Sequence, residues 1–128
     1  MIKITESSIQ LLIEKFKDDK EAIMLIKDCL LSFSKYHASI YRMETYMKLF
    51  GYGNTDKEDY QQEVISLDND RTSSHNRVIS SISIFNRLCE KKDIPLIYDG
   101  VVSEEKPYRR EIADACLEYI SAIIQKRQ

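Results

Sequence analysis

The fold is decided by residues 19–50, DKEAIMLIKDCLLSFSKYHASIYRMETYMKLF, in which apolar side chains recur at every third or fourth position. The series begins at Ala22 and continues without a break to Phe50. Gly51 follows, in the place where many helices end with a glycine in the left-handed conformation. This stretch therefore predicts one uninterrupted helix from Asp19 to Phe50.

A second long helix is predicted after a short loop. The loop Gly51-Tyr52-Gly53-Asn54-Thr55 has the composition of a turn, and Asp56 then stands where an N-cap residue belongs. The next apolar stripe keeps the same spacing through Tyr60, Val64, Leu67, Val78, Ile82, Phe85 and Cys89. Asp93-Ile94-Pro95 should end the helix, because a residue before proline avoids the helical region. The result is an antiparallel hairpin, Asp19–Phe50 against Asp56 to about Lys92.

The second helix of this hairpin has one weak point. Asp68-Asn69-Asp70-Arg71-Thr72-Ser73-Ser74 is rich in residues that prefer helix ends to helix interiors. An unbroken helix over the whole range would be about 50 Å long, more than the body of a compact chain of this size. We therefore expect either a kink near Asp70 or a hairpin that overhangs the rest of the domain.

Two shorter helices complete the predicted fold. Thr5 can cap a first helix with apolar residues Ile9, Leu12, Ile13 and Phe16. A last helix should begin near Ser103, Glu104, Glu105 and Pro107, and its wide apolar face runs from Ile112 to Ile124. Leu96–Val102, between the second long helix and the last, should tuck against the bundle. The prediction is a single all-α domain, residues 1–128, built as a four-helix bundle.

Composition agrees with helices and excludes several classes of protein. Only 3 Gly and 2 Pro occur in 128 residues, too few for the turns of a β-barrel or sandwich. Lys and Arg number 19 against 21 Asp and Glu, so the basic bias of a nucleic-acid-binding protein is absent. No apolar run is long enough for a membrane helix or a signal peptide. We expect a cytoplasmic protein with no membrane or nucleic-acid partner.

The spacing of the cysteines and the absence of known motifs predict that the protein has no metal site and no cofactor. Cys29, Cys89 and Cys116 are odd in number, far apart and without a C-x-x-C pair, which fits a reducing compartment. Glycine-rich phosphate loops and common catalytic motifs are absent from the sequence. Any site must therefore be found among individual polar residues.

The most informative polar residues interrupt the apolar stripe of the second long helix. Arg71 and His75 lie one turn apart on its predicted buried side, with Asp68 three residues earlier. Pairing the hairpin about Gly53 places His37 opposite Asp68. A shared metal ion is unfavourable, because seven residues separate Asp68 from His75, about 10 Å along a helix. Two interpretations remain: a buried hydrogen-bonded network that fixes helix register, or a pocket in which Arg71 binds an anion and His75 moves a proton.

Some of these residues also carry a family resemblance. The elements Asp70-Arg71, His75-Asn76, Asn86-Arg87-Leu88-Cys89 and Arg110-Glu111-Ile112-Ala113-Asp114 resemble a family of small helical bacterial proteins known only as a domain of unknown function. The likeness spans about Asp68 to Arg127, and Arg-x-x-x-His-Asn is its most specific part. It implies a helical fold and a shared set of Arg71, His75, Asn76 and Asn86. It implies no substrate.

A weaker resemblance is to HEPN ribonucleases. These are helical bundles whose active site pairs an arginine with a histidine, with four to six residues between them. Only three residues separate Arg71 from His75, which departs from that pattern.

Two functions are left open by the sequence. The first is a non-enzymatic bundle of regulatory or adaptor type that binds a protein partner or forms a homodimer, because an overhanging hairpin would expose apolar surface. The alternative is a small-ligand-binding protein or enzyme, for a nucleotide or other anion or with HEPN-like ribonuclease activity. It would use Arg71 and His75 with Asp68 orienting the base, and its candidate ligand-binding residues are Asn76, Asn86, Arg110 and His37. The two differ in whether the His75 imidazole is sealed in the core or opens to a cavity.

Overall fold

The chain folds into four helices, as the sequence predicts. A computed structural model describes residues 4–98 and 106–126. Its helices are α1 (Glu6–Lys15), α2 (Lys20–Phe50), α3 (Glu58–Lys91) and α4 (Lys106–Lys126), and the described residues contain no strand. The predicted start of the last helix at Ser103 lies outside the described residues. The all-α bundle built on a long hairpin is confirmed.

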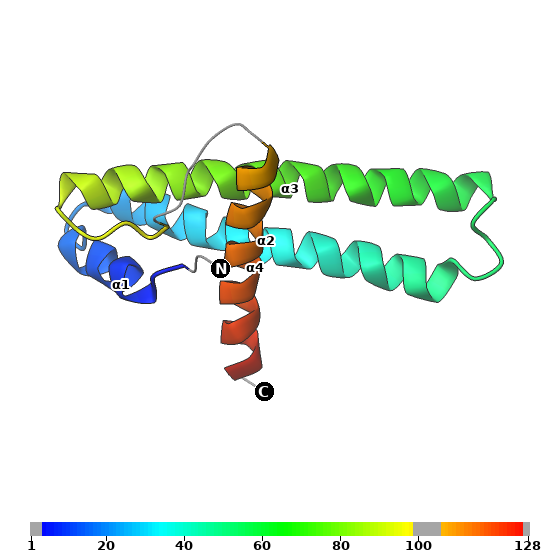
Figure 1. Cartoon of the computed structure of the whole chain (residues 1–128), viewed down its shortest axis with the longest axis horizontal. Helices are drawn as coiled ribbons and strands as arrows, with labels where there is room; N and C mark the ends of the chain where they lie inside the picture. The colour runs from blue at the N-terminus through cyan, green and yellow to red at the C-terminus, as the bar shows by residue number, and fades with distance from the viewer. Residues whose placement is uncertain (1–3, 99–105, 127–128) are drawn as a thin grey trace.

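The helices differ in how they lie on one another. Helices α2 and α3 run antiparallel along the length of the molecule, and α1 packs beside the end formed by the start of α2 and the end of α3 (Figure 1). Helix α4 does not run along the hairpin. It crosses both long helices near their middle at a steep angle, and contacts each of them (Figure 1).

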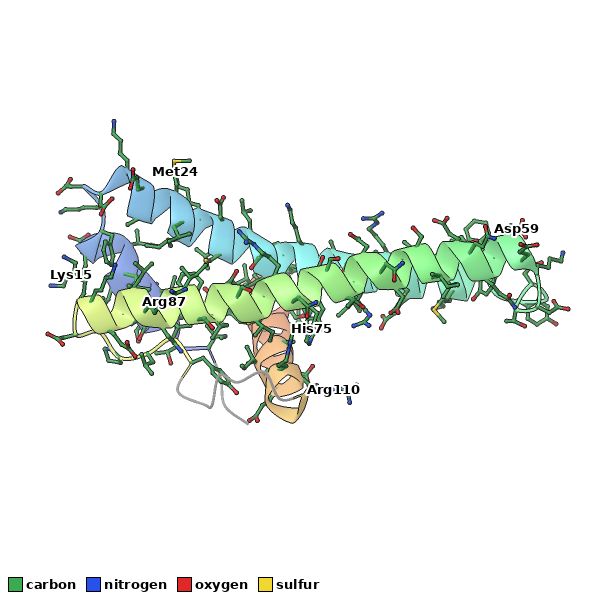
Figure 2. All side chains as sticks on the ribbon, turned by 90° about the horizontal axis from the view of Figure 1, so that it is seen from above. Lys15, Met24, Asp59, His75, Arg87 and Arg110 are labelled. Atoms are coloured by element: carbon green, nitrogen blue, oxygen red, sulfur yellow. The ribbon has the colours of Figure 1, made fainter. Side chains whose placement is uncertain are left out.

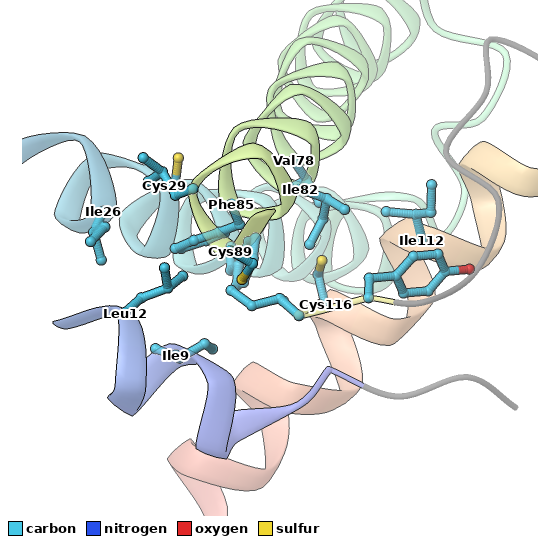
Figure 3. Packing of buried hydrophobic residues seen from close by; sticks show 14 of the residues in the cluster. Ile9, Leu12, Ile26, Cys29, Val78, Ile82, Phe85, Cys89, Ile112 and Cys116 are labelled. Carbon is cyan, nitrogen blue, oxygen red and sulfur yellow. The ribbon is translucent and has the colours of Figure 1, made fainter. Parts of the chain in front are cut away.

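The core lies on the side of this crossing where α1 is found. Its largest fully buried side chains come from all four helices and from the segment after α3: Leu12, Ile26, Phe33, Val78, Ile82, Phe85, Ile97, Tyr98 and Ile112. Figure 3 shows Leu12, Ile26, Phe85 and Ile112 converging on one apolar cluster. Cys29, Cys89 and Cys116 belong to the same cluster as free thiols, and burial raises the pKa of each. These three cysteines fill space in the core.

Several helix boundaries differ from prediction. Gly51 is right-handed, with φ −78° and ψ −28°, and the positive φ of the turn, 75°, belongs to Gly53. Glycine is still needed at position 51, because a Cβ there would collide with the Met47 carbonyl and the Tyr60 hydroxyl. Lys57, and not Asp56, is the N-cap of α3, and no side chain caps that helix. At the start of α2, Asp19, predicted as the first helical residue, is instead the N-cap, and its side chain accepts a hydrogen bond from the Ala22 amide at 3.1 Å.

Helix α3 is continuous through Asp68–Ser74, so of the two expected alternatives the break near Asp70 is not found. Its polar residues there are accommodated because they lie on exposed or half-buried faces, where they do not compete for a place in the core. The hairpin consequently extends beyond α4, and its far half consists of α2 and α3 alone (Figure 1). The expected overhang is present.

The segment after α3 is held against the bundle as predicted. Asp93 takes the left-handed φ of 54° that ends the helix, and Ile94, Ile97 and Tyr98 are buried. The Asn86 side chain donates to the Tyr98 carbonyl at 2.9 Å and accepts from the Tyr98 amide at 3.4 Å. The rest of the predicted connector, residues 99–102, lies outside the described residues.

Candidate functional site

A cleft of about 1220 Å³ opens where α4 crosses the hairpin. Ten residues line it: Tyr36 and Ile40 from α2, Arg71, Thr72, His75 and Asn76 from α3, and Arg109, Arg110, Asp114 and Leu117 from α4. Figure 2 shows His75 of α3 and Arg110 of α4 at this crossing. The cleft therefore brings together four of the predicted site residues from two separate regions of the chain: Arg71, His75, Asn76 and Arg110.

The spacing along α3 explains how one helix supplies four of these residues. Arg71 and His75 are one turn apart and share a face, and Thr72 and Asn76 are their neighbours on the adjoining edge. Arg71 is oriented by an ion pair, with its Nε 2.9 Å from the Asp68 carboxylate. Asp68 does not line the cleft itself. It therefore acts on the site through Arg71.

The interpretation of Asp68, Arg71 and His75 as a buried polar network is wrong about burial, because the ion pair within it is partly exposed. The side chains of Arg71 and Asp68 are 30% and 50% exposed, so their ion pair faces water. A pair of this kind contributes only about 0 to 1 kcal/mol to stability. The reason is that α4 crosses the hairpin and leaves this face partly open, whereas a helix lying along the hairpin would have covered it (Figure 1).

His75 opens to the cleft and lies against an aromatic ring. Its imidazole packs edge-on against Tyr36, with ring centroids 5.6 Å apart. Burial lowers the pKa of His75 below its ordinary value of 6.5; Asn76 opposes this shift, and the charges of Arg109 and Arg71 add to it. The imidazole is therefore neutral at pH 7, when one ring nitrogen can accept a proton or a hydrogen bond from a ligand.

Helix α4 supplies two further cationic groups, Arg109 and Arg110. The Arg109 guanidinium donates a hydrogen bond to the Asn76 side-chain oxygen and so joins α4 to α3 across the cleft. Arg110 is exposed and forms no ion pair with any residue in the described ranges. Among the residues that the structure describes, Asp114 is the one acid that lines the cleft.

Two candidate residues lie elsewhere. His37 lines a smaller neighbouring hollow and not the cleft, so it does not join Arg71 and His75. Asn86 is engaged by the Tyr98 backbone and does not line the cleft either. Within residues 4–98 and 106–126, no group of three or more His, Cys, Asp or Glu could hold a metal ion.

Several cleft residues are not predicted from the sequence. Tyr36 falls within the apolar series of α2, and Thr72 and Asp114 are given no role in a site. Arg109 forms a basic doublet with Arg110, and only Arg110 is a predicted site residue. That doublet is the one available signal, but its place opposite Arg71 depends on how α4 crosses the hairpin.

Comparison with known proteins identifies the family. The family described as "Protein of unknown function (DUF3232)" matches residues 2–128. The chain belongs to the DUF3232 family. Family membership thus extends over the first hairpin helix and α1 as well as the region from Asp68 onward. Neither curated proteins nor solved structures gave a match for this DUF3232 chain. In its described part, no helix combines the length and the apolarity needed to cross a membrane.

The lowered pKa of His75 predicts a pH dependence of stability. Between the folded and unfolded pKa values the unfolded chain binds more protons, so the free energy of unfolding should fall as the pH drops below about 6.5. Urea unfolding of the wild type and of His75→Gln, between about pH 7 and pH 5, measures this effect. Over this pH range the free energy of unfolding should fall less in His75→Gln than in the wild type. An identical pH dependence in both proteins would contradict the assignment.

Proposed function

We propose that this protein binds a phosphate-bearing anion in the cleft between α2, α3 and α4. The supporting observation is the charge of the described lining residues: Arg71, Arg109 and Arg110 converge there, and Asp114 is the one acid among them, although the chain as a whole has a net charge of −2. Guanidinium groups are well suited to phosphate and carboxylate ligands because they donate paired hydrogen bonds.

The other lining groups suit the same ligand. Thr72 and Asn76 offer hydrogen-bonding groups on the exposed edge of α3, and Tyr36 and Ile40 form an apolar floor. A small number of polar groups placed over an apolar surface is typical of small-molecule sites. Because His75 opens to this cleft, the ligand-binding interpretation is favoured over a sealed structural network.

Titration calorimetry with pyrophosphate tests this proposal. We expect saturable binding of one pyrophosphate per chain, weakened by added salt. Arg110→Ala should lower the affinity about tenfold, since one charge-assisted hydrogen bond contributes about 1.5 kcal/mol. Arg87→Ala is the matched control, because Arg87 is also exposed but lies on α3 away from the cleft (Figure 2). Absence of binding, or an equal loss in both variants, would refute the proposal.

A second candidate function, self-association, is supported by the free half of the hairpin. Exposed apolar side chains gather at its end: Met47, Leu49, Phe50, Tyr52 and Ile65. Tyr46 stacks on both Phe50 and Tyr60 there, at centroid distances of 5.2 and 5.5 Å. Charges of both signs surround them, with Lys48 and Lys57 near Glu58 and Asp59. Two copies related by a twofold axis can pair such charges while covering the apolar residues.

This candidate predicts a homodimer at micromolar concentration. Light scattering should give about twice the chain mass of 15.0 kDa. Leu49→Glu should return the protein to the monomer, because it places a charge among the apolar side chains of the tip. Met24→Glu is the control, since Met24 is equally exposed but lies at the opposite end of α2. A 15.0 kDa species at every concentration would exclude the dimer.

We also infer a cytoplasmic location for this protein. The inference is supported by its three buried free thiols, Cys29, Cys89 and Cys116. Free thiols persist in a reducing compartment.

A further inference from the structure

A second hollow, lined by different chemical groups, adjoins the cleft. This hollow, of about 220 Å³, is lined by His37, Ile40, Tyr41, Glu44, Leu117 and Ser121. Ile40 and Leu117 also line the cleft, so the two spaces adjoin at these two side chains. Both spaces are lined by residues of α2 and α4, near the crossing of these two helices.

The two spaces complement different chemical groups. The cleft holds three arginines, whereas the described lining of the second hollow contains no lysine or arginine and has the carboxylate of Glu44 instead. A carboxylate repels phosphate but accepts hydrogen bonds from hydroxyl and amine groups. His37 and Ser121 add further hydrogen-bonding groups, and Tyr41 offers an aromatic face that is largely exposed. Ile40 and Leu117 separate the two polar regions with apolar surface.

The dimensions suit a ligand longer than a phosphate ion. Tyr36 lines the cleft and Glu44 lines the second hollow, eight residues apart on α2, which corresponds to about 12 Å along the helix axis. A ligand that spans both spaces therefore needs an anionic end, a middle that tolerates apolar contact, and a far end that donates hydrogen bonds.

We propose that the ligand is a nucleoside phosphate that spans both spaces. This inference rests on the proposed anion-binding function and specifies its ligand class. The phosphate groups lie among Arg71, Arg109 and Arg110, and the nucleoside packs over Ile40 and Leu117. Hydroxyl or amine groups of the nucleoside donate hydrogen bonds to Glu44, and its base has the ring of Tyr41 available for stacking.

Calorimetry with matched probes tests the proposal. The probes are pyrophosphate, adenosine, and the four common ribonucleoside diphosphates. At least one diphosphate should bind ten times more tightly than pyrophosphate, because it adds the contacts of the second hollow. Glu44→Ala should remove most of this gain and leave pyrophosphate affinity unchanged. Glu63→Ala is the control, because it deletes an exposed acidic side chain of the hairpin that lines neither space.

The outcomes separate this inference from the function on which it rests. If pyrophosphate binds and no nucleoside diphosphate binds more tightly, the nucleoside assignment is wrong and anion binding stands. If Glu44→Ala and Glu63→Ala change nucleotide affinity equally, Glu44 does not contact the nucleoside and the assignment is again wrong. If none of the probes binds, the proposed function itself fails.

Discussion

Replacing Phe85 by alanine is expected to lower the free energy of unfolding by about 3 to 5 kcal/mol. Phe85 has no exposed surface and its ring lies 6.0 Å from the ring of Phe33, between the two long helices. Removing it leaves a cavity in the contact that holds the hairpin together. A single domain is stable by about 5 to 15 kcal/mol, so this loss would consume much of the total. Urea unfolding followed by circular dichroism measures it.

The same substitution at Phe50 provides the control. Phe50 is 57% exposed and stacks only on Tyr46 at the free end of the hairpin. Phe50→Ala should therefore cost less than about 1 kcal/mol. Equal losses at Phe85 and Phe50 would show that the far half of the hairpin is as well packed in solution as the core, contrary to the structure.

Replacing Arg71 by alanine is expected to separate binding from stability. The ion pair with Asp68 is exposed, so the free energy of unfolding should fall by less than about 1 kcal/mol. Pyrophosphate affinity should fall about tenfold to a hundredfold, because a charge-assisted contact to the ligand contributes about 1.5 to 3 kcal/mol. Arg71→Ala should lower pyrophosphate affinity more than Arg110→Ala, because Asp68 already holds the Arg71 side chain in place.

Thermal melts of Arg71→Ala, Arg71→Met and His75→Ala distinguish this account from a structural one. The three variants should melt within a few degrees of the wild type, since a loss of 1 kcal/mol shifts the midpoint by about 2 to 6 °C in a domain of this size. Strong destabilisation by all three, of about 3 to 5 kcal/mol each, would mean that Arg71 and His75 belong to a buried network.

The helices follow from sequence because their signals are local. The apolar spacing from Ala22 to Phe50 depends on neighbouring residues alone, and the long helix that it predicts is confirmed. The sequence left open whether α3 breaks near Asp70 or overhangs the domain; the helix is continuous, because weak helix formers cost little on a surface face. Gly51 follows the helix as predicted, but its conformation differs from the prediction. Glycine is required there by the close approach of Tyr60, a residue across the turn, and not by a left-handed φ.

The site depends on packing that no local pattern contains. Arg71 and His75 share a face because they are one turn apart, and the sequence predicts this correctly. Whether that face is buried depends on the angle of α4, which follows from how Ile112, Cys116 and Ile120 fit against the hairpin. The steep crossing opens the cleft and brings Arg109 to Asn76.

The most direct test of anion binding in this cleft is a titration of isotope-labelled protein with pyrophosphate, followed by amide chemical shifts. The account predicts saturable changes, described by one binding constant, that are largest at residues 71–76 of α3 and 109–114 of α4. Lys17 and Lys48, which lie far from the crossing, should change little. Changes that grow without saturation, or that are largest at other lysines and arginines, would contradict the account.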